Sequence, residues 1–116
     1  MPSKSAAGDP LYLGEFELIV LLAVLRLGDQ AYGVTIQTEL ERETSRQLTV
    51  GAIYKTLGRL QQKGYVSVRI GDPTPQRGGR RKKYYRVESL GSRALKQSVA
   101  DLRRLTRGLG RTLEAL

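Results

Sequence analysis

The chain has 116 residues, a formal net charge of +9 and a pI near 10.3, and it contains neither cysteine nor histidine. That length fits one ordinary domain, and the absence of cysteine excludes disulfides and thiolate metal sites. Without histidine the chain lacks the usual neutral-pH general base and the commonest metal ligand. The acidic residues are also spread out, whereas metal-dependent nucleases cluster them, so we expect no enzyme activity, no metal and no cofactor.

The charge is unevenly distributed along the chain. Residues 1–50 carry four Lys/Arg and seven Asp/Glu, whereas residues 51–116 carry sixteen and four. We therefore expect the second half to face a polyanion. The alternative is that the positive charge only keeps the protein soluble.

The amino-terminal residues 1–12 are predicted to be a flexible tail, since they contain Pro2, Gly8 and Pro10 and no apolar core typical of a secretory signal. The longest apolar run, Leu18 to Leu27, is about half as long as a membrane helix. These features predict a cytoplasmic protein with no membrane partner.

Two helices are predicted in the first half. The segment from Gly14 to Leu27 is apolar on nearly every side, which is typical of a central helix. The second helix should run from Tyr32 to about Arg46, with an apolar stripe of Tyr32, Ile36 and Leu40. Its charged residues are expected to face water: Glu39, Glu41, Arg42 and Glu43.

A third helix should follow Thr49, a good capping residue. Its apolar side consists of Val50, Ile53, Leu57 and Leu60, and its opposite side of Ala52, Lys55, Arg59 and Gln62, with Tyr54 at the edge. A basic face with small side chains in the first turn suits reading of a DNA major groove. The alternative is an ordinary solvated face on a core helix.

Residues 65–70 alternate as a half-buried strand does, with Val66, Val68 and Ile70 on one side, and residues 82–87 are predicted to be the returning strand. The turn between them, residues 71–79, is rich in glycine and proline. Five cations lie at or near its tip: Arg77, Arg80, Arg81, Lys82 and Lys83. A basic run is usually a solvated tail, but this run lies between two strands, so we expect contact with phosphates or a minor groove.

The last segment, residues 89–116, is predicted to be a helix that forms a dimer. Its apolar residues recur at seven-residue spacing with others between them: Leu95, Val99, Leu102, Leu105, Leu109, Leu113 and Leu116. Gly108 and Gly110 weaken its final turns. The alternative is a helix that packs back on its own domain.

The order of these elements predicts a mainly α winged helix-turn-helix fold, with a tail at 1–12, a winged helix domain at 13–88 and a dimerisation helix at 89–116. Three stretches make a more specific match: LGEFELIVLLAVL, AYGVTIQTEL with LTVGAIYKTLGRLQQKGYV, and GGRRKKYYRVESLGSRAL. Together they resemble the short form of the PadR-like family of bacterial transcriptional regulators. The resemblance implies a homodimer that binds a palindromic DNA operator, usually as a repressor and in some members with a small-molecule effector.

Carried over by position, the resemblance assigns DNA contacts to Thr49, Ala52, Tyr54 and Lys55 on the reading helix and to Arg77, Arg80 and Arg81 on the wing. We add Arg59, Lys82 and Lys83 for their charge and leave Tyr65 and Tyr85 to packing. Lys55 departs from the family pattern, in which proline often follows the tyrosine, so base preference does not carry over. With one Phe and no Trp, the chain offers no evident aromatic pocket for an effector. An RNA-binding or nonspecific nucleic-acid-binding module is the alternative function.

Overall fold

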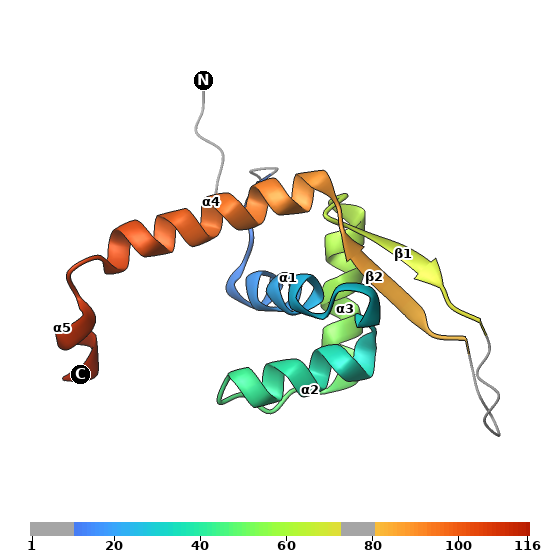
Figure 1. The fold of residues 1–116 in the computed structure, drawn as a ribbon, viewed down its shortest axis with the longest axis horizontal. Helices are drawn as coiled ribbons and strands as arrows, with labels where there is room; N and C mark the ends of the chain where they lie inside the picture. The colour runs from blue at the N-terminus through green and yellow to red at the C-terminus, as the bar shows by residue number, and fades with distance from the viewer. Residues whose placement is uncertain (1–10, 73–80) are drawn as a thin grey trace.

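The computed structural model describes residues 11–72 and 81–116. Figure 1 shows a body of three helices, a two-stranded sheet projecting to one side, and a long helix running away to the other. This is the predicted winged helix fold with a carboxy-terminal helix. The elements, in chain order, are α1 (Glu15–Leu27), the short 3-10 helix η2 (Gly28–Gln30), α2 (Gly33–Glu43), α3 (Val50–Gln62), β1 (Val66–Ile70), β2 (Lys83–Val87), α4 (Ser89–Thr106) and α5 (Gly110–Glu114).

The core lies where α1, α2 and α3 meet. Most of the predicted apolar positions are buried there, and seven of them are at most 1% exposed: Val20, Leu21, Val24, Ile36, Ile53, Leu57 and Leu60. Tyr32 and Val50 are half-buried, and Leu25 of α1 is 56% exposed. The sheet and α4 close the core with Tyr65, Val66, Tyr85, Ala94 and Leu95. Burial of a large aliphatic side chain stabilises a fold by about 1.5–3 kcal/mol, so this cluster holds the three helices together.

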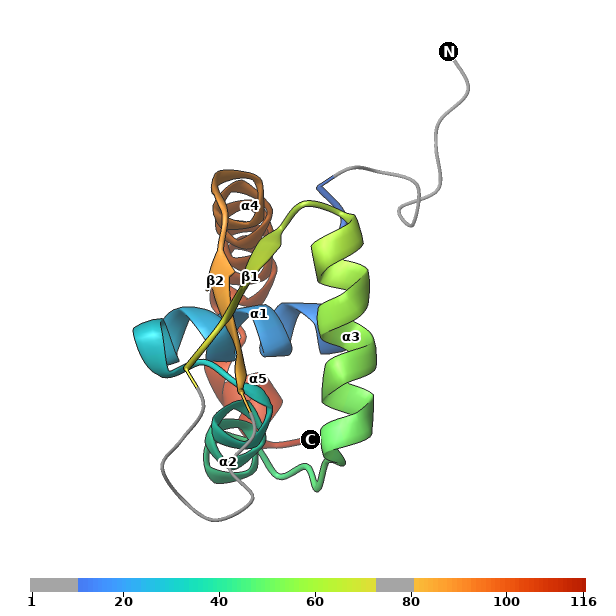
Figure 2. The ribbon, with the colours of Figure 1, turned by 90° about the vertical axis from the view of Figure 1, so that its right-hand side faces the viewer.

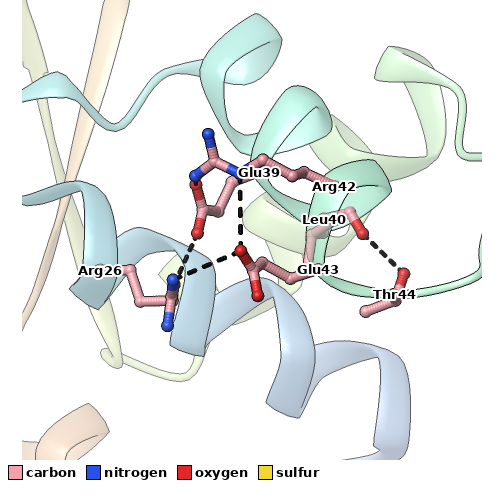
Figure 3. A network of polar contacts seen from close by, with 6 residues as sticks. All are labelled: Arg26, Glu39, Leu40, Arg42, Glu43 and Thr44. Carbon is pink, nitrogen blue, oxygen red and sulfur yellow. Dashed lines mark hydrogen bonds and ion pairs between the residues drawn. The ribbon is translucent and has the colours of Figure 1, made fainter.

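Helix α2 differs from the prediction in its end and in one charged residue. It ends at Glu43 rather than near Arg46, because Thr44 turns out of the helix while its N–H and hydroxyl both donate to the carbonyl of Leu40. Glu39 was expected to face water, but it is buried. Its carboxylate accepts hydrogen bonds from Arg42 and from Arg26 of α1, the latter at 2.5 Å (Figure 3). A buried charge is tolerated when it is paired, so these arginines explain the burial.

Strands β1 and β2 form an antiparallel hairpin in the predicted order, with Val68 opposite Tyr85 and Arg69 opposite Tyr84. One side of the hairpin packs on the helices through Val66 and Tyr85. Ile70, predicted to lie on the packed side, is 52% exposed because the hairpin there extends beyond the helical body. The predicted turn, with Arg77 and Arg80, lies largely outside the described residues.

The carboxy-terminal segment is not one continuous helix. Helix α4 ends at Thr106, and Gly108 has a φ of +79°, a conformation that side chains other than glycine rarely adopt. The chain then turns into the short α5, so Leu109 and Leu113 do not continue the stripe of α4. Leu95 was expected in a dimer contact, but only 4% of it is exposed because it packs in the core of its own chain. Among the described residues, no helix is long and apolar enough to cross a membrane.

Candidate nucleic-acid interface

Helix α3 presents one open face to solvent. Thr49 caps it as predicted, its hydroxyl accepting from the N–H of Ala52 at 3.1 Å. Ala52, Tyr54 and Lys55 are exposed, and side chains added at Gly51 or Gly58 would meet nothing. The small residues on this face therefore allow the helix backbone to come close to a DNA groove.

Arg59, also predicted to contact DNA, is exposed on α3 but has partners within the chain. Its guanidinium donates to the hydroxyl of Thr56 at 3.1 Å and lies 3.7 Å from the carboxylate of Glu17. Lys63, one turn further on, donates to the same carboxylate at 2.8 Å. The end of α3 that carries Arg59 is thus joined to α1, and its charge is partly neutralised.

The pKa of Glu17 reflects this contact. Burial raises the pKa of the carboxyl, but the hydrogen bonds from Lys63 and the Gly14 N–H and the charges of Lys63 and Arg59 outweigh it. The pKa therefore lies below the ordinary value of 4.5. Glu17 is charged at neutral pH and holds the amino-terminal part of α1 to the carboxy-terminal part of α3.

The described part of the wing carries predicted and unpredicted cations. Arg81 and Lys83 are exposed as predicted, whereas Lys82 is half-buried and its Nζ lies 4.5 Å from the centroid of the Tyr32 ring. Arg69 and Arg86 on the two strands are also exposed. We did not select these two arginines from the sequence, although alternation along the strands placed them opposite the buried Val66 and Tyr85.

Charge separates the two sides of the domain. The described segments α3, β1 and β2 contain no Asp or Glu, whereas α1 and α2 together carry five. Within the described ranges, Lys55, Arg81 and Lys83 have no carboxylate within ion-pair distance. Figure 2 looks onto this side, with α3 and the sheet next to each other. We call it the basic face, defined by the exposed residues of α3 and of β1–β2.

The packing between α3 and the sheet involves two tyrosines. Tyr85, left to packing by the sequence analysis, is 6% exposed, and Tyr65 is fully buried, so both assignments are confirmed. Burial raises the pKa of Tyr85, with a smaller contribution from the nearby Tyr54 of α3. Tyr85 of the wing is therefore close enough to Tyr54 of the reading helix for their charges to interact.

The remaining described surface contains no cluster of acidic side chains that could hold a metal ion. The most unusual part of this surface is the carboxy-terminal segment, where large apolar side chains are exposed. Every residue from 101 to 116 is exposed, including four leucines of the predicted dimer set: Leu102, Leu105, Leu109 and Leu113. Val99, also in that set, is half-buried.

A three-helix body with an open third helix beside a basic two-stranded wing defines a winged helix-turn-helix protein. Within that class, the sequence pattern of the Transcriptional regulator PadR-like family matches residues 21–97, and the chain belongs to this family.

Individual relatives agree with this assignment. An uncharacterized protein X from Lysinibacillus sphaericus is 31% identical over 90 residues, which is 76% of this chain and 78% of the relative. A PadR family transcription regulator from Clostridium difficile R20291 is 27% identical with a TM-score of 0.62, over 82% of this chain and 97% of that chain. PadR of Bacillus subtilis, solved in complex with operator DNA, shares the fold with a TM-score of 0.59 and 23% identity, over 72% of this chain and 47% of that one.

Proposed function

We propose that this protein is a homodimeric transcriptional regulator that binds a specific duplex DNA site through the basic face. Helix α3 enters the major groove with Thr49, Ala52, Tyr54 and Lys55, while cations of the wing bind flanking phosphates. The observation that carries this proposal is the absence of acidic residues from α3, β1 and β2, next to cations that have no partner within the described chain. Such cations are available to neutralise a polyanion.

PadR of B. subtilis was solved in complex with operator DNA and shares this fold, which supports duplex DNA as the partner. Arg77 and Arg80, which lie outside the described residues, belong to the same proposed wing contact as Arg81, Lys82 and Lys83. Arg59 contributes less than Lys55, because Glu17 already lies beside it.

The dimer is proposed from the carboxy-terminal segment. Its leucines at positions 102, 105, 109 and 113 are 40–72% exposed, and a second copy of the chain is the partner that we assign to them. The interface set is Val99, Leu102, Leu105, Leu109 and Leu113, without the buried Leu95. Two-fold symmetry would place two copies of α3 in successive major grooves, about 34 Å apart, on a palindromic site.

Repression is the regulatory outcome we propose, because a dimer that occupies a promoter excludes polymerase without a further contact. A reporter gene behind the bound site should be expressed more strongly when the regulator is deleted.

An effector is a separate proposal. A hollow of about 320 Å³ lies between the end of α1 and the sheet and is lined in part by Leu25, Tyr84 and Arg86. It has room for a small molecule.

The test is a gel shift of the purified protein with the DNA upstream of its own gene, with random duplex and RNA as competitors. A specific regulator keeps its site against both competitors, with one dimer per site. If a dimer makes 6 to 10 phosphate contacts, affinity should fall by roughly 10³- to 10⁵-fold between 50 and 200 mM salt. Equal competition by RNA would instead support a general nucleic-acid-binding module.

Matched lysine and arginine variants locate the interface. Lys55→Ala and Arg81→Ala should each weaken binding and reduce the slope of log affinity against log salt by about one. Lys96→Ala and Arg93→Ala remove exposed cations from α4, outside the basic face, and should leave the slope unchanged. Equal effects of all four variants would mean that net charge, and not the basic face, drives binding.

A further inference from the structure

Four side chains form a continuous stack where the wing meets the body. The guanidinium carbon of Arg69 on β1 lies 4.5 Å from the ring centroid of Tyr84 on β2. The Tyr84 ring meets that of Tyr32, just before α2, edge to face at 5.3 Å and 69°. Lys82 Nζ lies 4.5 Å from the Tyr32 centroid. We call Arg69, Tyr84, Tyr32 and Lys82 the tyrosine junction.

The backbone around the tyrosine junction is also closely packed. The N–H of Tyr85 on β2 donates to the carbonyl of Ala31 at 2.8 Å, so the segment before α2 is bonded to the wing. At Gly71 an added Cβ would lie 2.6 Å from the Tyr84 ring, which leaves room for glycine alone. The Tyr84 ring therefore occupies space that a side chain at position 71 would otherwise fill.

The same short segment also contacts the reading helix. A Cβ at Gly33 would lie 2.5 Å from the ring of Tyr54 on α3, so that ring packs directly on the backbone at the start of α2. Residues 31–33 thus contact the wing through Ala31 and Tyr32 and contact α3 through Gly33. Three consecutive residues therefore connect the wing to the reading helix.

A two-stranded hairpin is at best marginally stable alone in water, so the position of this wing depends on what holds its base. Edge-to-face rings stabilise a contact beyond the burial of their surface, and a cation over a ring face adds an electrostatic attraction. A cation–ring contact also restricts a long side chain without neutralising it. Arg69 and Lys82 are thus held in place with their charge intact.

We infer that the tyrosine junction fixes the wing relative to the reading helix, and that Tyr32 and Tyr84 are positioning residues that hold Arg69 and Lys82 for contact with DNA phosphates. This inference rests on the proposed function for its phosphate contacts. Its structural part, the fixing of the wing by two rings, does not need DNA. The two parts are therefore tested separately.

The first test uses the protein without DNA. Tyr84→Leu and Tyr32→Leu each remove a ring, whereas Tyr84→Phe and Tyr32→Phe keep the ring and remove only the hydroxyl. Within the described residues these two hydroxyls make no hydrogen bond. Hydrogen exchange of the β2 amides, above all the Tyr85 N–H bonded to Ala31, should speed up in the Leu variants and stay unchanged in the Phe variants. Tyr12→Leu replaces a half-buried tyrosine far from the wing in sequence and should leave hydrogen exchange of the β2 amides unchanged. Unchanged exchange in both Leu variants would overturn the inference.

The second test measures DNA binding over a range of salt. The Leu variants should lose about five- to tenfold in affinity at low salt and show a salt slope shallower by about one or two, as loss of two placed cations requires. The Phe variants should keep both values. Arg81→Ala should have a smaller effect in the Tyr84→Leu background than in the wild type, because a displaced wing no longer brings Arg81 to its phosphate.

Two further outcomes are decisive. Additive effects of Tyr84→Leu and Arg81→Ala, with an unchanged salt slope, would assign the tyrosines to ordinary packing. If the Leu variants fail to fold, Arg69→Leu and Lys82→Met remove the two cations of the junction while keeping both rings, and each should lower the salt slope by about one. If the wild type binds no DNA while the Leu variants loosen β2, the proposed function fails and the positioning of the wing stands.

Discussion

The helical body and the carboxy-terminal segment are both rich in leucine, but they use it in opposite ways. In the body, Leu21, Leu57 and Leu60 are fully buried within one chain. In residues 101–116 no side chain is buried, and Leu105 is 72% exposed. The body is complete as a single copy, whereas a five-residue helix such as α5 is too short to be stable alone in water. Local sequence therefore explains the body, whereas the exposed leucines of the segment are what the proposed dimer would explain.

A matched pair of substitutions tests this contrast most strongly. Leu57→Ala should lower the free energy of unfolding by about 2–5 kcal/mol through the lost burial and the cavity left behind. Leu105→Ala should cost the single chain less than about 0.5 kcal/mol. Denaturant unfolding at several protein concentrations separates the two, since only the Leu105→Ala effect should depend on concentration. Equal effects at all concentrations would contradict the contrast.

The next prediction concerns assembly. Leu105→Asp should abolish the dimer and thereby weaken binding to a palindromic site by about 100-fold or more, because each half-site then binds independently. Gln97→Asp adds the same charge at another exposed position of α4, outside the proposed leucine set, and should change neither property. Sedimentation gives the oligomeric state and gel shifts give the affinity. A dimer that survives Leu105→Asp would remove this leucine from the interface.

Within the body, the contrast between buried and exposed charge gives a smaller effect. Glu39→Ala leaves Arg26 and Arg42 without their shared buried partner and should cost about 1–3 kcal/mol. Both arginines are more than half exposed, so water limits the loss. Glu41→Ala, an exposed neighbour on the same helix, should cost less than about 1 kcal/mol. Thermal unfolding of the two variants tests the difference. An equal loss of stability would mean that the buried ion pairs of Glu39 contribute no more than an exposed glutamate does.

Periodicity predicted most of the fold because each helix and strand buries one regular side. The stripe of Ile53, Leu57 and Leu60 defined α3, its open face and its place in the core. The cap at Thr49 is a local signal and was found in the same way. What depends on one short segment can be predicted from that segment.

Contacts between distant segments could not be predicted in this way. The burial of Glu39 depends on Arg26 of another helix, and seven-residue spacing does not say whether the neighbours of Leu95 come from its own chain or from a second copy. Gly108 and Gly110 indicated a weak point, but the turn between α4 and α5 follows from the backbone at Gly108. For the site, nothing local in the sequence placed Tyr84 against Tyr32.

The last prediction is a pH dependence at the contact between α1 and α3. The pKa of Glu17 is lower in the folded chain than its ordinary value of 4.5. A group with a lowered folded-state pKa stabilises the fold above the unfolded-state pKa and loses this contribution as the pH falls through the folded-state pKa. Glu17→Gln should therefore be less stable than the wild type by about 1 kcal/mol at neutral pH, since Lys63 and Arg59 lose their charged partner.

That difference should begin to shrink as the pH falls below about 4.5 and should vanish once the wild-type carboxyl is protonated in the folded chain as well. Glu15→Gln is the control, because this carboxylate is 72% exposed and, among the residues that the structure describes, forms its ion pair with Arg46 on the surface. Urea unfolding of the three proteins between neutral pH and pH 3 measures the difference. A Glu17→Gln deficit that is the same at every pH would mean that side-chain shape, and not the charge on Glu17, joins α1 to the reading helix.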